Sequence, residues 1–369
     1  MKKMTFKYFV SRIIMGIINQ GVFQVVFISF ILLIMSCSKD KSNNAELTDF
    51  KVNSISNKDI SFVKTKLDKE LAHVCLYFEN NLFEETFPIK LKVSPIISSK
   101  AKVLLDSPSE LVFENPNQVV SFDIEAENGD MKTWYVFLIH KQLQNSNFSM
   151  WFNNQGLNGR YYKEIGSSFV ESVWSTANMG TSTYSSYGTQ PITDGSNTMV
   201  QLRTDSVRVL PITAATLFTG VFNLSGAISN PTNPQAAVLF GTPFIYSPVS
   251  FKVKYKYTSG RWLKKAKLRD VNNIFGGFTE NGIEGEDQCA IYAILENRDK
   301  SPVVEVARAE LFSASTANNL TEEIVEFSYV SEIKPTHVTV VFSSSRYGDF
   351  WQGAVNSTLI VDYFKFIYE

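Results

Sequence analysis

The stretch at positions 348–369, GDFWQGAVNSTLIVDYFKFIYE, indicates the fold of this chain. Within it, Ser357–Phe366 alternates aliphatic and aromatic residues with polar ones and carries one aspartate, Asp362, a pattern typical of a β-strand. An exposed edge on such an apolar strand would promote aggregation. We therefore expect this strand to be paired and covered by an earlier part of the chain.

The rest of the chain predicts an all-β protein, because short apolar-polar runs separated by turn residues replace any sustained helical periodicity. Residues 47–141 contain about seven such runs, the scale of an immunoglobulin-like sandwich. Asn128-Gly129-Asp130 separates the last two, and Asn-Gly favours a tight hairpin turn. After a polar junction at 142–147, residues 145–369 carry longer strands and long connections, which favour a larger two-sheet jelly roll.

Six segments of this larger region, taken in order, resemble the putative carbohydrate metabolism domain family of Bacteroidetes. They are NSNFSMW, VWSTANMG, TDGSNTMVQLRT, FKVKYKYTSG, DQCAIYAILENR and the final 22 residues. The resemblance implies a jelly roll with a pocket placed like the sugar sites of other jelly-roll proteins. It also implies that the final strand lies centrally in one sheet, near the first strand of its own domain. The smaller region is similar to the immunoglobulin-like N-terminal domains of Bacteroidetes surface lipoproteins. The similar segments are LTDFKV, LKVSPIISSKAKVLLDSP and VSFDIEAENGDMKTWYVFLI. This resemblance implies that the smaller domain is a spacer.

Residues 1–36 have the layout of a secretory signal. Four basic residues precede an apolar stretch, and Ile34-Met35-Ser36-Cys37 then resembles a bacterial lipobox. In that pattern Cys37 carries acyl chains after cleavage, which predicts an outer-membrane lipoprotein facing the periplasm or the cell surface. The alternative is a transmembrane anchor, although Asn19, Gln20 and Gln24 interrupt the apolar run. Residues 37–46 are then a polar tether.

Charge and cysteine content limit the classes of partner and cofactor. The net charge is -1, and removing residues 1–36, with four positive and no negative charges, changes it from -1 to -5. Nucleic acid is therefore not expected as a partner, because phosphate binding needs a clustered basic surface. Cys75 and Cys289 lie in apolar segments of different domains and are expected to be buried thiols. The three histidines are scattered, so zinc has too few ligands.

The sequence suggests one cofactor to consider, a structural calcium ion. No other cofactor is expected. In many jelly-roll carbohydrate-binding modules an aspartate of the last strand, here Asp362, ligates calcium together with an acidic residue near the first strand. This chain has Ser149 at the latter position, which removes a carboxylate. A hydrogen-bonded Asp362 is therefore preferred over a calcium ligand.

Sugar binding requires flat aromatic rings for the apolar faces of a pyranose and fixed polar groups for its hydroxyls. The long loops contain both kinds of residue, and the candidate ligand-binding residues are Trp174, Asn178, Tyr184, Tyr187, Asp194, Arg346, Asp349 and Trp351. Each has an alternative structural role. The two tryptophans could close the core beneath a loop, Asp194-Gly195 could be only a turn, and Arg346 could pair with Asp349 across Tyr347-Gly348.

A catalytic site is less well supported by the sequence. Glycoside hydrolysis normally uses two carboxyl groups, and the nearest candidates are Asp287 and Glu286, with Glu284 beside them. Gly282 and Gly285 suggest that this segment is a solvated loop. Glu305 and Glu310 have opposite parity along a strand, which predicts opposite faces.

Three hypotheses of function follow, in order of preference. The first is an envelope-anchored lipoprotein that binds an oligo- or polysaccharide and contacts the membrane through Cys37. The second is a glycoside hydrolase with a carboxylate pair in the jelly-roll pocket. The third is an adhesion or scaffold protein. The sequence leaves open which sugar is bound and whether it is cleaved.

Overall fold

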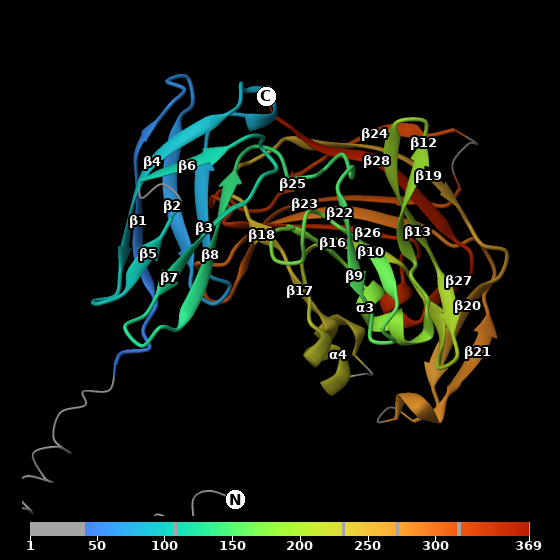
Figure 1. Ribbon diagram of the computed structural model, residues 1–369. Coiled ribbons are helices and arrows are strands. Elements are labelled where there is room, and N and C mark those ends of the chain that lie inside the picture. The colour runs from blue at the N-terminus through green and yellow to red at the C-terminus, as the bar shows by residue number, and fades with distance from the viewer. Residues whose placement is uncertain (1–40, 106–108, 231–232, 271–272, 316–318, 369) are drawn as a thin grey trace, which may run out of the picture.

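The computed structural model describes residues 41–105, 109–230, 233–270, 273–315 and 319–368. The predicted signal peptide and Cys37 lie outside these residues. Within them the chain forms two β-sandwiches that lie side by side (Figure 1), so the all-β fold and the order of a smaller and a larger sandwich are confirmed. None of the described helices is long and apolar enough to cross a membrane.

The smaller sandwich consists of two sheets that enclose one core. Its three-stranded sheet has the order β1 (Leu47–Ile55), β4 (Ile89–Ile97), β6 (Glu110–Phe113). Its five-stranded sheet has the order β2 (Phe62–Asp68), β3 (His73–Phe78), β8 (Met131–Ile139), β7 (Val120–Glu125), β5 (Lys102–Leu104). The predicted hairpin joins β7 to β8, and Gly129 has a φ of 92°, which favours glycine. Trp134 and Phe50 lie in the core.

The larger sandwich has a five-stranded sheet packed on an eight-stranded sheet (Figure 1). The former has the order β12 (Thr189–Asp194), β13 (Asn197–Arg203), β28 (Thr358–Ile367), β19 (Ser250–Thr258), β24 (Thr321–Glu326). The latter has the order β11 (Trp174–Thr176), β16 (Thr216–Phe222), β26 (His337–Ser343), β22 (Cys289–Asn297), β23 (Val304–Ser313), β25 (Ser328–Tyr329), and β17 (Val238–Phe240) and β18 (Thr242–Pro243) add to it.

Smaller elements connect or flank these sheets. They are the strand pairs β9 (Trp151–Gln155) with β10 (Tyr161–Ile165) and β14 (Asp205–Val207) with β15 (Leu210–Thr213), and the three-stranded sheet of β21 (Phe278–Gly282), β20 (Leu263–Leu268) and β27 (Gln352–Ala354). The helices are α3 (Asn178–Thr181), α4 (Leu224–Ser229) and the 3₁₀ turns η1 (Leu82–Glu84), η2 (Ser182–Tyr184), η3 (Pro234–Ala237), η4 (Ile274–Gly276) and η5 (Gly348–Phe350).

Strand β28 lies between β13 and β19, so the prediction of a central final strand is confirmed. Strand β28 does not pair with the first strand of the domain, because among the described strands β9 pairs with β10 in a separate hairpin. The nearest approach is through the preceding segment, where Phe364 N–H donates to the carbonyl of Ser146. Positive φ angles at Asn145 and Phe148 turn the chain between this hydrogen bond and the start of β9.

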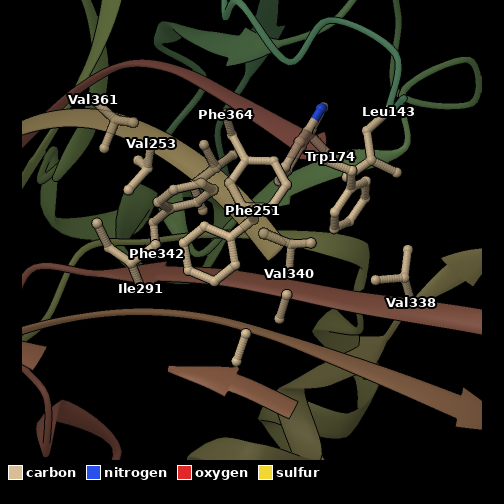
Figure 2. Close-up of a cluster of buried hydrophobic side chains, with 14 of the residues drawn as sticks. Leu143, Trp174, Phe251, Val253, Ile291, Val338, Val340, Phe342, Val361 and Phe364 are labelled. Carbon is tan, nitrogen blue, oxygen red and sulfur yellow. The ribbon is translucent and has the colours of Figure 1, made fainter. Parts of the chain in front are cut away.

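The core between the two large sheets is rich in phenylalanine and valine (Figure 2). Phe251, Val253, Phe342, Val361 and Phe364 point into it from the facing strands. This apolar core also includes Tyr77 and Ile139 of the smaller sandwich. Cys75 and Cys289 are buried free thiols, as expected.

The junction between the sandwiches is packed against both of them. Gln144, Asn145 and Ser146 are buried, and the side chain of Gln142 exchanges hydrogen bonds with backbone N–H and C=O of Phe366. The hydroxyl of Tyr246 donates to the carbonyls of Phe78 and Ile139 at 2.5 and 2.8 Å. These bonds hold the two sandwiches in contact rather than leaving a free linker.

Candidate functional site

The outer face of the eight-stranded sheet carries the densest group of rings and charges next to the predicted loops. Alternation along β22 sends Ile291 and Ala293 into the core and Tyr292 to the opposite side. Tyr292 pairs with Glu310 of β23 on one side and Val341 of β26 on the other. We call this surface the Tyr292 face; its members are Tyr292, Ile294, Glu305, Arg308, Glu310, Phe312 and Val341.

Tyr292 is the centre of this surface. Burial raises the pKa of its phenol to about 12, with further contributions from the negative charges of Asp349 and Glu310, while Arg308 opposes the shift. Asp349 belongs to η5, a loop element, whereas the other two residues belong to β23. The phenol therefore stays protonated at neutral pH and is surrounded by charges of both signs, which suits it to donate a hydrogen bond.

Arg308 binds two carboxylates on this face. Its Nε and Nη2 donate to the two oxygens of Glu305 at 3.0 and 2.8 Å, and its Nη1 donates to Glu310 at 2.8 Å. Hydrogen bonding to Arg308 lowers the pKa of Glu305. The parity argument that put Glu305 and Glu310 on opposite faces is wrong, because the register of β22 and β23 shifts between Leu295 and Glu296.

Arg346 lies next to this group. Its guanidinium carbon is 3.6 Å from the ring centre of Phe312 and 5.0 Å from that of Tyr347. Nη1 donates to the side chain of Gln288 at 3.0 Å, and the backbone N–H donates to the carbonyl of Gln288. Arg346 is thus fixed by a stacking contact and two hydrogen bonds, as a rigid polar group beside a ring.

The β16 side of the face is apolar. Phe218, Phe222, Ala237 and Val341 form a small buried cluster, against which Tyr292 and Met179 pack. Met179 comes from α3, so the loop that contains the predicted residue Asn178 packs against the same apolar cluster as Tyr292 does. Helix α4 lies on this side of the sheet, opposite the five-stranded sheet (Figure 1).

Asp287, the first catalytic candidate, instead holds the loop that bears Arg346 and Asp349. It is 4% exposed, and its Oδ2 accepts hydrogen bonds from the hydroxyls of Ser345 and Ser357 at 2.6 and 2.7 Å and from the N–H of Ala354 at 2.8 Å. A buried carboxylate with these bonds is a structural anchor, which favours a structural role over the predicted catalytic role of Asp287. Glu286 is exposed in the preceding loop.

Trp174 and Asn178 are also structural, in contrast to their predicted role in ligand binding. The Trp174 side chain is 2% exposed among Phe342, Phe364 and Leu143 (Figure 2), and its indole N–H donates to the carbonyl of Gln144 at 2.7 Å. Asn178 is buried, and its amide both donates to and accepts from the backbone of Thr189. Neither side chain can reach a ligand.

The remaining predicted residues separate into different places. Tyr187 stacks on Tyr162 of β10 with ring centres 5.0 Å apart and 10° between the planes, and Tyr184 is 37% exposed in η2 nearby. Trp351 is half-buried and lies edge-to-face with Phe278 at 5.2 Å. Of the eight candidates, the structure brings only Arg346 and Asp349 to the Tyr292 face.

Asp194 occupies the turn between β12 and β13, where Gly195 has a φ of 61°. The six residues of β12 separate it from Thr189, the partner of Asn178, by about 17 Å at the usual rise of a strand. The structural role, a hairpin turn, is therefore favoured for this residue.

Asp362 is 8% exposed and accepts a hydrogen bond from the Asn197 amide at 2.7 Å. Its other oxygen lies 2.8 Å from the ammonium of Lys254. The chain itself thus supplies a hydrogen bond and a cation to this carboxylate. Among the described residues, no group of three or more histidine, cysteine or acidic side chains could hold a metal ion.

Glu164 of β10 is a second buried carboxyl group, close to the loop of α3. Burial raises its pKa to about 7, although hydrogen bonds from Thr176, the Ile165 N–H and Tyr162 act to lower that pKa. Thr176 also accepts the N–H of Asn178. Glu164 therefore supports the α3 side of the Tyr292 face as Asp287 supports the η5 side.

An open pocket of about 650 Å³ lies on the hairpin of β20 and β21. Trp262, which is 74% exposed, lines it together with Arg261, Glu280 and Glu284. Trp262 is not among the candidates predicted from the sequence, although it follows the turn residues Ser259-Gly260 much as the predicted aromatic residues lie beside turns. The Tyr292 face remains the stronger candidate because two loops and a sheet converge on it.

The model of one protein family matches residues 139–367, and its description is putative carbohydrate metabolism domain. The chain belongs to this family. The match begins at the last residue of β8 and covers the larger sandwich, so the carbohydrate-related class inferred from the six segments is confirmed. No curated protein matches the chain.

Solved structures of similar proteins include two from Bacteroides. A putative glycoside hydrolase from Bacteroides thetaiotaomicron is 22% identical over 90% of this chain and 99% of its own, with a TM-score of 0.49. A putative glycoside hydrolase from Bacteroides vulgatus is 22% identical over 60% of this chain and 97% of its own, with a TM-score of 0.48. A family 16 carbohydrate-binding module is 9% identical over 49% and 86%, with a TM-score of 0.25.

Proposed function

We propose that the carbohydrate metabolism domain binds an oligo- or polysaccharide on the Tyr292 face. The observation that carries this proposal is the position of Tyr292 on a central strand, with Asp349, Glu310 and Arg308 close enough to shift the pKa of its phenol. Asp349 comes from the loop element η5, and α3 packs against the apolar cluster next to Tyr292. The membership of the chain in a carbohydrate-related family supports the same conclusion.

The chemistry of the face suits a sugar. The rings of Tyr292, Phe312 and Tyr347 offer apolar surfaces for C–H groups, while the guanidinium of Arg346 and the carboxylates of Asp349 and Glu310 can bind hydroxyls. Because Arg346 and Arg308 are already held by other side chains, little side-chain freedom is lost when a sugar binds.

The experiment is a glycan array on the mature chain with Cys37 replaced by alanine, followed by affinity electrophoresis with each glycan retained. We expect Tyr292→Ala and Arg346→Ala to weaken retention by about 10-fold or more. Lys252→Ala, on the outer face of the other sheet, is the matched control and should bind as the parent does. Normal retention by both site variants would contradict the proposal.

Hydrolysis is the second candidate function. Asp349 and Glu310 place two carboxylates near one phenol, the number of groups that glycosidic cleavage requires. Release of reducing ends from a retained polysaccharide, abolished in both Asp349→Asn and Glu310→Gln, would favour an enzyme over a binding protein. Saturable binding to a protein with no glycan signal would favour the adhesion or scaffold hypothesis.

We further propose that the mature protein is an outer-membrane lipoprotein anchored at Cys37, with the smaller sandwich as an immunoglobulin-like spacer. The lipobox-like Ile34-Met35-Ser36-Cys37 supports the anchor. Residues of the predicted tether already contact the spacer, where Ser42 N–H donates to Glu127 and Ser98 donates to the carbonyl of Asn44. Acyl chains on Cys37 in the mass spectrum, absent in Cys37→Ala, would test this anchor.

A further inference from the structure

Strand β20 and the residue that follows it carry a row of exposed basic residues, Lys265 and Lys267 in the strand and Arg269 just after it, which we call the basic row. The three residues alternate along the chain, so successive members lie on one face at intervals of about 7 Å. This concentration of positive charge stands out in a protein whose net charge is -1. Figure 1 shows β20 and β21 extending from the end of the larger sandwich.

The two lysines of the basic row have no acidic residue opposite them on the neighbouring strands. The residues opposite Lys265 are Asn281 and Gln352, and the residue opposite Lys267 is Thr279. Arg269 is followed directly by Asp270. Lys264, on the other face of β20, pairs instead with Glu280 at 3.0 Å. Three like charges at this spacing repel one another unless an anion lies against them.

We propose that the basic row binds the negative groups of an acidic polysaccharide, such as a polymer of uronic acids. This inference rests on the proposed glycan-binding function and specifies its ligand class. A polyuronate repeats its carboxylates at regular intervals, as the row repeats its cations. The amides of Asn281 and Gln352 and the hydroxyl of Thr279 can bind sugar hydroxyls between them.

The basic row is also connected to the Tyr292 face. Strand β27, which pairs with β20, begins two residues after the end of η5, the element that carries Asp349. The two surfaces therefore share one segment, 346–354, which Asp287 holds in place through Ser345 and Ala354. A polysaccharide longer than the Tyr292 face can extend toward the hairpin.

The test compares polygalacturonate and alginate with their carboxyl-reduced forms in affinity electrophoresis. The probe variant is Lys265→Gln/Lys267→Gln/Arg269→Gln. The matched control, Lys51→Gln/Lys90→Gln/Lys92→Gln, removes the same charge from exposed strand positions of the smaller sandwich. We expect the parent and the control to prefer at least one acidic polymer about 10-fold over its reduced form at about 50 mM salt, and this preference to disappear at about 500 mM.

The probe variant should lose that preference while it binds any neutral glycan as the parent does. An equal preference in the probe variant, or no preference in the parent for either acidic polymer, would overturn the inference. Binding of the parent to vesicles of anionic phospholipid, lost in the probe variant and without polyuronate binding, would assign the row to a membrane instead. If Tyr292→Ala keeps the acidic preference, the basic row stands and the Tyr292 face fails as the glycan site.

Discussion

The two outer faces of the larger sandwich arise from the same strand alternation but differ in what surrounds them. On the five-stranded sheet, Lys252 and Lys254 pair with Glu322 and Asp362 at 2.7 and 2.8 Å, and the hydroxyl of Tyr363 donates to Glu322. On the eight-stranded sheet, Arg308 is likewise paired, yet Asp349 and Arg346 are added from a loop. The first face is a set of ion pairs between neighbouring strands, and the second is the candidate site.

The difference shows that a sheet face becomes a candidate binding site when loops bring side chains to it. In a cross-strand ion pair such as Lys252–Glu322 the two charged groups satisfy each other, which leaves few hydrogen-bonding groups for a ligand. Loop residues come from outside the ladder, so they can face strand residues such as Tyr292 across a space. Removing the support of a loop should therefore make the second face resemble the first.

The largest effect is expected from Asp287→Ala. This change leaves the hydroxyls of Ser345 and Ser357 and the N–H of Ala354 without their buried acceptor, which should cost about 3 kcal/mol of unfolding free energy. The loop bearing Arg346 and Asp349 loses its anchor, so glycan retention should fall as well. Denaturant titration and affinity electrophoresis measure both. A variant as stable as the parent would contradict the anchoring role.

Glu164→Gln tests the support on the α3 side, and the sign of its effect depends on pH. Folding raises the pKa of Glu164 from 4.5 to about 7, so the folded state favours the neutral form. Stability is then lost as pH rises through this interval, and the glutamine variant should be more stable by about 3 kcal/mol at about pH 8.

At about pH 4 the glutamine variant should match the parent, because Glu164 is then neutral in both states. The control is Glu305→Gln on the Tyr292 face, where the pKa is lowered by Arg308. That variant should lose a small amount of stability above about pH 5, the opposite sign. Thermal unfolding across this pH range measures both variants, and a pH-independent effect of Glu164→Gln would contradict its buried neutral state.

Tyr292→Phe separates the contribution of the Tyr292 hydroxyl to glycan retention from that of its ring. The ring stays, so stacking should persist, while loss of a hydrogen bond worth about 1 kcal/mol should weaken retention by roughly 5-fold. The fold should be unaffected, since the hydroxyl lies on the outer side of the sheet. If Tyr292→Phe binds as weakly as Tyr292→Ala, the hydroxyl rather than the ring accounts for recognition.

The smallest effect is expected from Lys252→Ala on the five-stranded sheet. Its partner Glu322 is solvent-exposed, and exposed ion pairs contribute little because water and salt screen them. Melting temperature and glycan retention should both stay within error of the parent. A clear loss of retention would place the ligand on the five-stranded sheet and reverse the comparison.

Much of the fold was predictable because a strand can be recognised from the alternation of apolar and polar residues in a short segment. The alternation in Thr358–Ile367 and in the segment of β22 indicated paired strands, and Asn128-Gly129 indicated a hairpin. Position within the sheet was only partly predictable. The final strand is central as expected, but its neighbours β13 and β19 follow from packing between segments distant in the sequence.

The site was harder to predict because the type of a residue does not determine whether its side chain is exposed. Trp174 and Arg346 had equal standing as loop residues beside turns, yet the first fills the core and the second lies over Phe312. Tyr292 carried a usable signal, a large aromatic at the outward position of an apolar strand, which received no weight. The bulge between β22 and β23 left no such signal, and it put Glu305 beside Arg308.

The sequence by itself determined that this protein is built of β-strands, that it has two sandwiches, and that the larger one belongs with carbohydrate-related domains. These properties depend on local alternation and on ordered short motifs, which a chain carries wherever it folds. Only the tertiary structure decided that Asp287 is an anchor, that Asp362 pairs with Lys254, and that the charge of Asp349 raises the pKa of Tyr292. Contacts of this kind depend on register and loop path, which many distant residues set together.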